Sequence, residues 1–165
     1  GLNGVAAGGA VSLALACDII VARRSARFVS AFSRIGLLPD CGGSWLYIQA
    51  FGLHRAKAFA MLEQEISAEQ AHGLGVVAKL TEEHDFKEVL QETATHFVLA
   101  SPDAMRITKH ALNAATINDL PTQLGLERKW QNSAANGNDF QEGITAFRDR
   151  RKPDFGAKPE ENRGK

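Results

Sequence analysis

The chain has 165 residues, with 19 basic and 19 acidic side chains, a formal net charge of zero and a hydrophobic content of 44%. This composition is typical of one soluble globular unit, and the balanced charge excludes the basic bias of proteins that bind nucleic acid or an anionic membrane. Two cysteines, Cys17 and Cys41, are too few for a disulfide framework, so we expect small packed thiols and a reducing, cytoplasmic location.

The first segment, from Asn3 to Ile20, predicts a strand, a glycine hinge, a helix and the start of a second strand. Gly8 and Gly9 let the backbone turn sharply and leave the first amides of the helix open to a ligand. Those amides, with the positive end of the helix dipole, form a place for an oxyanion. Taken alone, such a glycine pair is more often a tight turn without a ligand, and its spacing is not the G-x-G-x-x-G of a dinucleotide site.

The first residues of the chain bear on two further expectations, an upstream part of the domain and the possibility of a membrane partner. The chain starts inside a structural unit and without Met, so we expect part of the domain to lie upstream. The apolar run from Val5 to Cys17 is too short and too rich in glycine to span a bilayer, and no cationic segment precedes it. No membrane partner is therefore expected.

The middle of the chain predicts short strands and helices, and the rest predicts helices alone. Strands are expected at residues 18–22, 26–29 and 76–80, and helices at 41–51, at 54–62 and from a capping box at 67–70 to Gly73 or Gly75. Four longer helices follow at 85–99, 101–115, 120–135 and 139–151. A tail marked by Pro153, Gly156, Pro159 and Gly164 ends the chain.

The predicted helices of the second half carry more apolar side chains than a thin α/β core seems able to cover. These side chains are Phe97, Leu112, Leu120, Leu124, Leu126, Trp130, Ile144 and Phe147. Packing on neighbouring subunits is the natural way to bury them, so we expect an oligomer. The alternative is that these helices fold back on an upstream portion of the chain.

Several segments, in the same order and with little shift in spacing, resemble the crotonase (enoyl-CoA hydratase/isomerase) superfamily. They are residues 3–9, 13–19, 26–28, 35–43, 66–71, 73–77 and 147–155. The resemblance covers essentially the whole chain and implies an α/β fold. It implies the C-terminal part of a crotonase-like ββα spiral core at residues 1–99 and a helical trimerisation and CoA-lid region at residues 100–165.

The resemblance also implies a chemistry. Members bind acyl-CoA thioesters and stabilise an enolate, or another thioester oxyanion, with two backbone amides. Gly9 matches the amide at the helix start, and the second amide lies upstream in family members. Loss of one such donor typically costs about a hundred- to a thousandfold in rate, so the chain alone is not expected to catalyse. No cofactor or metal is expected, because coenzyme A is part of the substrate.

The acid–base residues separate the reactions of the family. Hydratases that resemble this chain carry two glutamates where this chain has Ser12 and Phe32, and neither side chain can activate water as a carboxylate does. Asp40 matches a catalytic aspartate of ring-epoxide isomerases of phenylacetate catabolism and of 4-chlorobenzoyl-CoA dehalogenase. A carboxylate among apolar side chains can keep its proton to higher pH and transfer it beside a thioester. The alternative for Asp40 is a plain helix N-cap.

Further side chains are candidates for lining the acyl pocket or for other roles. Ser12, Phe32, Leu37 and Trp45 are candidate pocket walls, although Ser12 can equally bond back to its own helix. Cys41 has no histidine partner in view, which favours a packed thiol over a reactive one. The five histidines, His54, His72, His84, His96 and His110, lack metal-ligand spacing.

Phe147 and Arg150, near the end of the chain, match positions at which family trimers reach into the CoA site of a neighbouring subunit. The aromatic ring would lie by the adenine, and the guanidinium would bind phosphate through its forked donors. The alternative is a solvated helix end, because Arg148, Arg151 and Lys152 lie beside them.

These observations together predict an acyl-CoA-metabolising enzyme that isomerises an enoyl-CoA or a ring-epoxide-CoA through an enolate. Its expected assembly is a homotrimer or a dimer of trimers, without nucleic acid or membrane as partners. An enoyl-CoA hydratase is the first alternative. A trimeric scaffold that binds acyl-CoA without turnover is the second, because both hydratase glutamates are missing.

Overall fold

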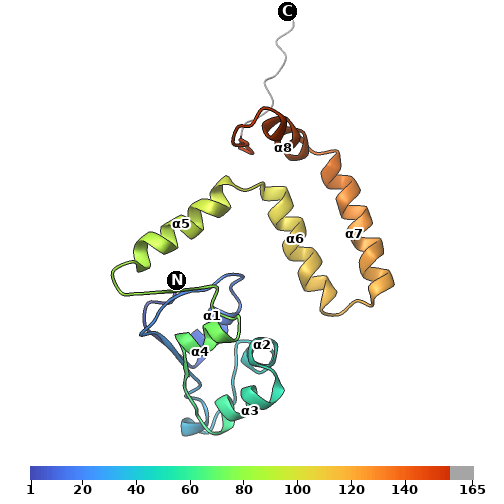
Figure 1. The fold of residues 1–165 in the computed structure, drawn as a ribbon. Coiled ribbons are helices and arrows are strands. Elements are labelled where there is room, and N and C mark those ends of the chain that lie inside the picture. Colours follow the sequence, from blue (N-terminus) through green and yellow to red (C-terminus); the bar gives the residue numbers. More distant parts are fainter. Residues whose placement is uncertain (157–165) are drawn as a thin grey trace, which may run out of the picture. The chain divides into compact units, whose positions relative to one another are not determined.

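The computed structural model describes residues 1–156, and the chain divides into two compact units, Gly1–Glu92 and Thr93–Lys165 (Figure 1). The division falls within helix α5 (Phe86–Leu99), whereas the predicted domain boundary lies at the end of that helix. The predicted tail positions Pro159 and Gly164 lie outside the described residues. None of the helices in residues 1–156 combines the length and the apolarity that a membrane crossing needs.

Five short strands of the first unit form two small sheets. The strands are β1 (Val5–Ala7), β2 (Val21–Arg23), β3 (Arg27–Val29), β4 (Ile66–Ser67) and β5 (Lys79–Thr81). In one sheet β3 is central, with β1 parallel and β4 antiparallel to it; in the other, β2 and β5 are parallel. The register places Phe28 opposite both Ala6 and Ile66, and all three side chains are buried. This row of apolar residues fixes the face of the sheet that meets the core.

Helices pack around these strands. The first unit contains α1 (Gly9–Leu15), a 3₁₀ turn η1 (Ser33–Ile35), α2 (Gly43–Phe51), α3 (Leu53–Met61) and α4 (Ala68–Gly73). The predicted capping box at α4 is confirmed: the Ser67 hydroxyl accepts the Gln70 amide at 3.1 Å, and the Gln70 side chain accepts the Ser67 amide at 2.9 Å.

The predicted helix at 41–51 begins two residues later than expected. Cys41 and Gly42 have positive φ angles of 52° and 78°, so neither can belong to a right-handed helix. The strand predicted at 18–22 likewise begins at Val21, and the strand predicted at 76–80 begins at Lys79, because Val21 pairs with Lys79. Strand limits of this kind depend on the partner strand rather than on local composition.

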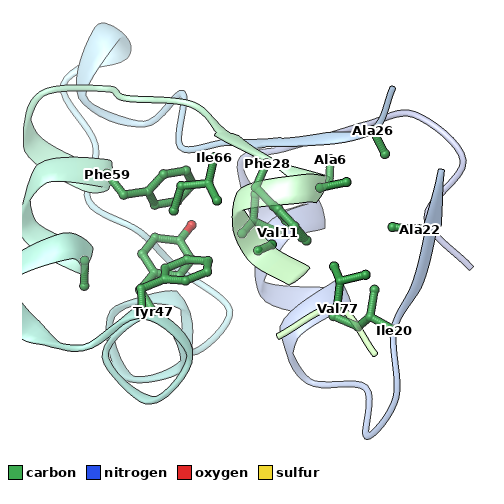
Figure 2. Close-up of a cluster of buried hydrophobic side chains, with 14 residues drawn as sticks. Ala6, Val11, Ile20, Ala22, Ala26, Phe28, Tyr47, Phe59, Ile66 and Val77 are labelled. Atoms are coloured by element: carbon green, nitrogen blue, oxygen red, sulfur yellow. The ribbon is translucent and has the colours of Figure 1, made fainter. Parts of the chain in front are cut away.

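The core of the first unit brings the strands and helices together (Figure 2). Figure 2 shows Tyr47 and Phe59 together in one part of the cluster and Ile20, Ala22 and Val77 in another. The Tyr47 and Phe59 rings meet edge to face with their centroids 5.0 Å apart, and Phe51 lies edge to face against Phe59 at 5.6 Å. Aromatic contacts of this geometry add to the free energy of burial and hold α2 against α3.

The second unit is helical. It contains most of α5, then α6 (Pro102–Ala115), α7 (Leu120–Ala135) and α8 (Asn138–Arg148), and Figure 1 shows α6 and α7 side by side. The predicted N-cap of α6 is confirmed, because the Ser101 hydroxyl accepts the Ala104 amide at 3.0 Å. Helix α8 ends before the predicted residue 151, since Arg150 has a φ of 54°.

Many apolar side chains of the second unit remain exposed in the described chain. Of those singled out from the sequence, the exposed ones are Phe97, Leu112, Leu120, Leu124, Ile144 and Phe147. Leu126 and Trp130 are half-buried. These exposed side chains are consistent with the expectation that the helices bury their apolar faces against other subunits, and the oligomer stays a prediction.

Candidate functional site

A glycine turn joins β1 to α1. Gly8 has φ 57° and ψ −127°, a conformation that residues with a side chain adopt only with strain. Its amide donates to the Val29 carbonyl at 2.9 Å, which ties the turn to β3. Gly9 is the first residue of α1, so its own amide has no carbonyl partner within the helix. The Gly9 amide is therefore one of the donors that the start of α1 leaves without an intrahelical acceptor.

The Asp40 carboxylate lies directly beside this turn. A Cβ atom at Gly9 would be 3.6 Å from Asp40 Oδ1 and 3.7 Å from Cys41 Sγ, which are ordinary contact distances. Gly9 and Asp40 lie on different elements, so only the packing of the first unit brings them together. The structure thus juxtaposes the two residues that the sequence analysis assigned to catalysis.

A tight turn presents Asp40. Its backbone carbonyl accepts the Gly43 amide at 2.7 Å and the Ser12 hydroxyl at 3.0 Å. The N-cap of α2 is Gly42, and no side chain caps this helix. The alternative that Asp40 is the N-cap is therefore wrong, because Gly42 holds that position and the Asp40 carboxylate does not cap α2.

Both cysteines differ from the expectation of packed thiols. Cys17 and Cys41 are exposed, because Cys17 follows the end of α1 and Cys41 stands in the turn before α2 rather than within a helix. A hydrogen bond to the Asp40 carboxylate, the charge of that carboxylate and partial desolvation raise the pKa of the Cys41 thiol. A raised pKa lowers the thiolate fraction at neutral pH, which makes Cys41 a poor nucleophile.

The four candidate pocket walls divide into two buried and two exposed residues. Ser12 is 1% exposed and bonds to Asp40 rather than to its own helix, while Phe32 is 8% exposed and its ring lies 3.8 Å from the point where a Cβ of Gly8 would stand. Leu37 and Trp45 are 58% and 59% exposed. Ser12 thus supports the Asp40 turn and Phe32 the glycine turn from within, whereas Leu37 and Trp45 are exposed in the described chain.

Two residues at this site were missed by sequence reasoning. Gly43 lies so close to α1 that a Cβ atom there would be 2.7 Å from Ser12 Oγ and 3.3 Å from Tyr47 Cζ. Tyr47 is almost completely buried, and its hydroxyl has no hydrogen-bond partner within residues 1–156. Burial raises the pKa of the Tyr47 hydroxyl, and the neighbouring Ser12 hydroxyl opposes this rise. The glycine pair at 42–43 was the signal in the sequence for this close approach.

The two predicted CoA-binding residues lie in the second unit. Phe147 is 88% exposed near the end of α8, and Arg150 is exposed just beyond it. Phe147 borders a hollow of about 460 Å³ between α6, α7 and α8. Beside them, Arg151 forms two hydrogen bonds to the Glu142 carboxylate and, with the Asp154 amide, lowers the pKa of Glu142 to about 2. The described residues hold no group of three or more side chains suited to binding a metal ion.

Comparison with known proteins identifies the family of the chain. The sequence matches the enoyl-CoA hydratase/isomerase family over residues 1–158. It is 43% identical to 1,2-epoxyphenylacetyl-CoA isomerase of Escherichia coli K12, with 95% of this chain and 60% of that protein aligned. It is 30% identical to short-chain-enoyl-CoA hydratase of Clostridium acetobutylicum, with 92% and 58% aligned.

Solved structures give the same result for the fold. The crystal structure of an enoyl-CoA hydratase from Polaromonas sp. JS666 superimposes with a TM-score of 0.86 at 37% identity, over 91% of this chain and 58% of that one. The predicted α/β crotonase-like fold is confirmed. The chain spans about 60% of the length of its curated relatives. The chain belongs to the enoyl-CoA hydratase/isomerase family, of which it represents a C-terminal portion.

Proposed function

We propose that the complete protein isomerises an acyl-CoA thioester, either an enoyl-CoA or a ring-epoxide-CoA, with the Gly9 amide as one oxyanion donor and Asp40 as the acid/base. The observation that carries this proposal is the position of Asp40 Oδ1, 3.6 Å from the Cβ that Gly9 lacks. A thioester oxygen bound to the Gly9 amide would place the adjoining acyl carbons within reach of that carboxylate.

The chemistry follows from this pairing. The Asp40 carboxylate takes a proton from a carbon next to the thioester, and the electron pair moves onto the thioester oxygen. The Gly9 amide stabilises the resulting enolate, with the second donor supplied from elsewhere in the complete protein. The carboxylic acid then returns the proton to a different carbon, which moves the double bond without any net gain or loss of atoms. In the ring-epoxide case, Asp40 would serve as the acid/base and the Gly9 amide as the oxyanion donor while the strained ring reacts.

Hydration is the second candidate, because one of the relatives is a short-chain-enoyl-CoA hydratase. Addition of water needs a base that holds the water, and Ser12 and Phe32 are buried and carry no carboxylate. Asp40 is then the one acidic side chain of the Gly9 turn in the described structure. These facts favour isomerisation, which needs a single proton shuttle.

The assembly and the CoA contacts belong to the same proposal. The proposed assembly is a homotrimer or a dimer of trimers in the cytoplasm, and the exposed apolar side chains of the second unit support self-association. In such an assembly, Phe147 would stack on the adenine of a neighbouring subunit's CoA, and Arg150 would bind its phosphate. Both side chains are exposed, as this role requires.

The test uses the full-length protein and its Asp40→Asn variant with enoyl-CoA isomers and ring-epoxide-CoA compounds. Asp40→Asn should lower kcat about a hundredfold or more, because an amide cannot accept the proton. Asp85→Asn, which neutralises an exposed carboxylate paired with His84, is the matched control and should keep full activity. Equal activity of the Asp40 variant would overturn the role of Asp40, a hydrated product would favour the hydratase, and binding without turnover would favour a scaffold.

A further inference from the structure

We propose that Ser12 is a positioning residue, whose hydroxyl holds the Asp40 turn against α1 and so keeps the Asp40 carboxylate beside the Gly9 amide. This inference rests on the proposed role of Asp40. Ser12 lies on α1, the helix that begins at Gly9, and its hydroxyl donates to the Asp40 carbonyl at 3.0 Å. This hydrogen bond therefore links the helix that carries the oxyanion amide to the loop that carries the carboxylate.

The turn that Ser12 holds is a strained one. Cys41 has a φ of 52°, a conformation that is costly for a residue with a side chain. The Asp40 carbonyl accepts two donors, the Gly43 amide at 2.7 Å and the Ser12 hydroxyl at 3.0 Å. The Gly43 bond closes the turn on itself, whereas the Ser12 bond is the one that attaches it to α1. Without Ser12 the turn would keep its shape but lose this attachment.

The surroundings of the Ser12 hydroxyl leave it little freedom. Ser12 is 1% exposed, and the position of a Cβ at Gly43 would lie only 2.7 Å from its oxygen and 3.3 Å from Tyr47 Cζ. Figure 2 shows the Tyr47 hydroxyl among the buried side chains of the core. The absence of a side chain at Gly43 thus lets α2 approach α1 closely enough for the Ser12 bond to form. A hydroxyl enclosed in this way has a fixed direction, which is what a positioning group needs.

The expected consequence is a loss in kcat rather than in binding. Ser12 is buried beneath the turn, so its removal takes away no surface that a substrate could contact. Displacement of a catalytic group by about 1 Å can cost up to a hundredfold in rate. Because the Gly43 bond remains, we expect Ser12→Ala to lower kcat by about tenfold while KM stays within about twofold.

Cys41 provides a readout that does not depend on turnover. Its thiol contacts the Asp40 carboxylate, which suppresses the thiolate, so its alkylation should become faster when that carboxylate moves away. Cys17 is also exposed and is not part of the turn, so its alkylation in the same sample is an internal reference. The variant Asp40→Asn gives the rate of Cys41 alkylation that is expected when the carboxylate charge is absent.

The experiment compares the full-length protein with Ser12→Ala, Ser12→Cys and the control Ser25→Ala. Ser12→Cys keeps nearly the same volume but has only a weak donor, so it decides the question if Ser12→Ala does not fold. Ser25→Ala removes an exposed hydroxyl that donates to Glu83. We expect the Ser12 variants to show the tenfold loss in kcat and about threefold faster alkylation of Cys41 at mildly alkaline pH, with Cys17 unchanged.

Two results would overturn the inference or its basis, and they are distinguishable. Folded Ser12 variants with unchanged kcat and unchanged Cys41 alkylation would show that Ser12 does not position Asp40, even if Asp40→Asn is inactive. Full activity of Asp40→Asn would instead refute the proposed function. Equal effects of Ser12→Ala and Ser25→Ala on kcat and on Cys41 alkylation would also refute the inference. The loss of any serine hydroxyl, rather than of the bond to Asp40, would then explain the data.

Discussion

Substitution of Gly43 by alanine tests the close approach of α1 and α2 that underlies the site. The new Cβ would stand 2.7 Å from Ser12 Oγ, 3.1 Å from Pro39 Cβ and 3.3 Å from Tyr47 Cζ. Non-bonded carbon and oxygen atoms do not approach to 2.7 Å, and Ser12 is enclosed, so α2 or the Asp40 turn must shift. Overpacking of this kind costs about 1–3 kcal/mol, which outweighs the gain of less than about 1 kcal/mol from the higher helix propensity of alanine.

A double-mutant cycle identifies the contact that causes the loss. Ser12→Ala removes the oxygen of the shortest contact, while the tight contacts of 3.1 Å to Pro39 Cβ and 3.3 Å to Tyr47 Cζ remain and keep part of the cost. The variant with both Ser12→Ala and Gly43→Ala should therefore be more stable than the sum of the single changes predicts, by about 1 kcal/mol.

The assay is urea unfolding of the full-length protein at one fixed protein concentration, because the stability of an oligomer depends on concentration. The four proteins of the cycle should show similar m values and different midpoints. The control Gly52→Ala places a Cβ where no atom lies within 4 Å, although its φ of 74° adds strain of its own. Because that strain does not involve Ser12, the change in the free energy of unfolding caused by Gly52→Ala should add to the change caused by Ser12→Ala. Additivity within about 0.5 kcal/mol for the Gly43 pair would refute the packing argument.

Two further predictions concern the oxyanion amide and the end of α8. Gly9→Pro removes the amide at the first helical position, where proline is well tolerated, so kcat should fall about a hundred- to a thousandfold with little change in thermal stability. Gly9→Ala, whose Cβ finds only ordinary contacts, keeps the amide and should retain much more activity in the same steady-state assay; equal rates would remove the amide from the mechanism. The pKa of Glu142 is lowered from 4.5 to about 2, so its interaction with Arg151 stabilises the folded state above pH 4.5 and is lost as the pH falls toward 2. Glu142→Gln should thus unfold at lower urea concentration than the parent at pH 7, and the two midpoints should converge in acid; a constant difference would contradict this account.

The sequence predicts those features of the fold that depend on neighbouring residues. The capping box at Ser67 and Gln70, the N-cap at Ser101 and the limits of α7 are confirmed, because a few adjacent side chains determine them. Strand β4 has only two residues and follows no alternating pattern, so it escaped prediction. It exists because Ile66 pairs with Phe28, a residue far away in the chain. Features set by such distant partners cannot be obtained from local composition.

The candidate site likewise combines features set by neighbouring residues with features set by distant partners. Gly8 and Gly9 were recognised from local chain geometry, and Asp40 from its resemblance to a family motif. The left-handed conformation of Cys41, by contrast, has no local signal, because cysteine has no preference for it. It arises in a turn whose Asp40 carbonyl accepts the Gly43 amide locally and the Ser12 hydroxyl from α1, and only the Ser12 bond requires the turn to be packed against α1. The sequence could therefore name the carboxylate and the amide, but only the packed structure shows why they meet: a buried hydroxyl on one helix and a missing side chain on the other.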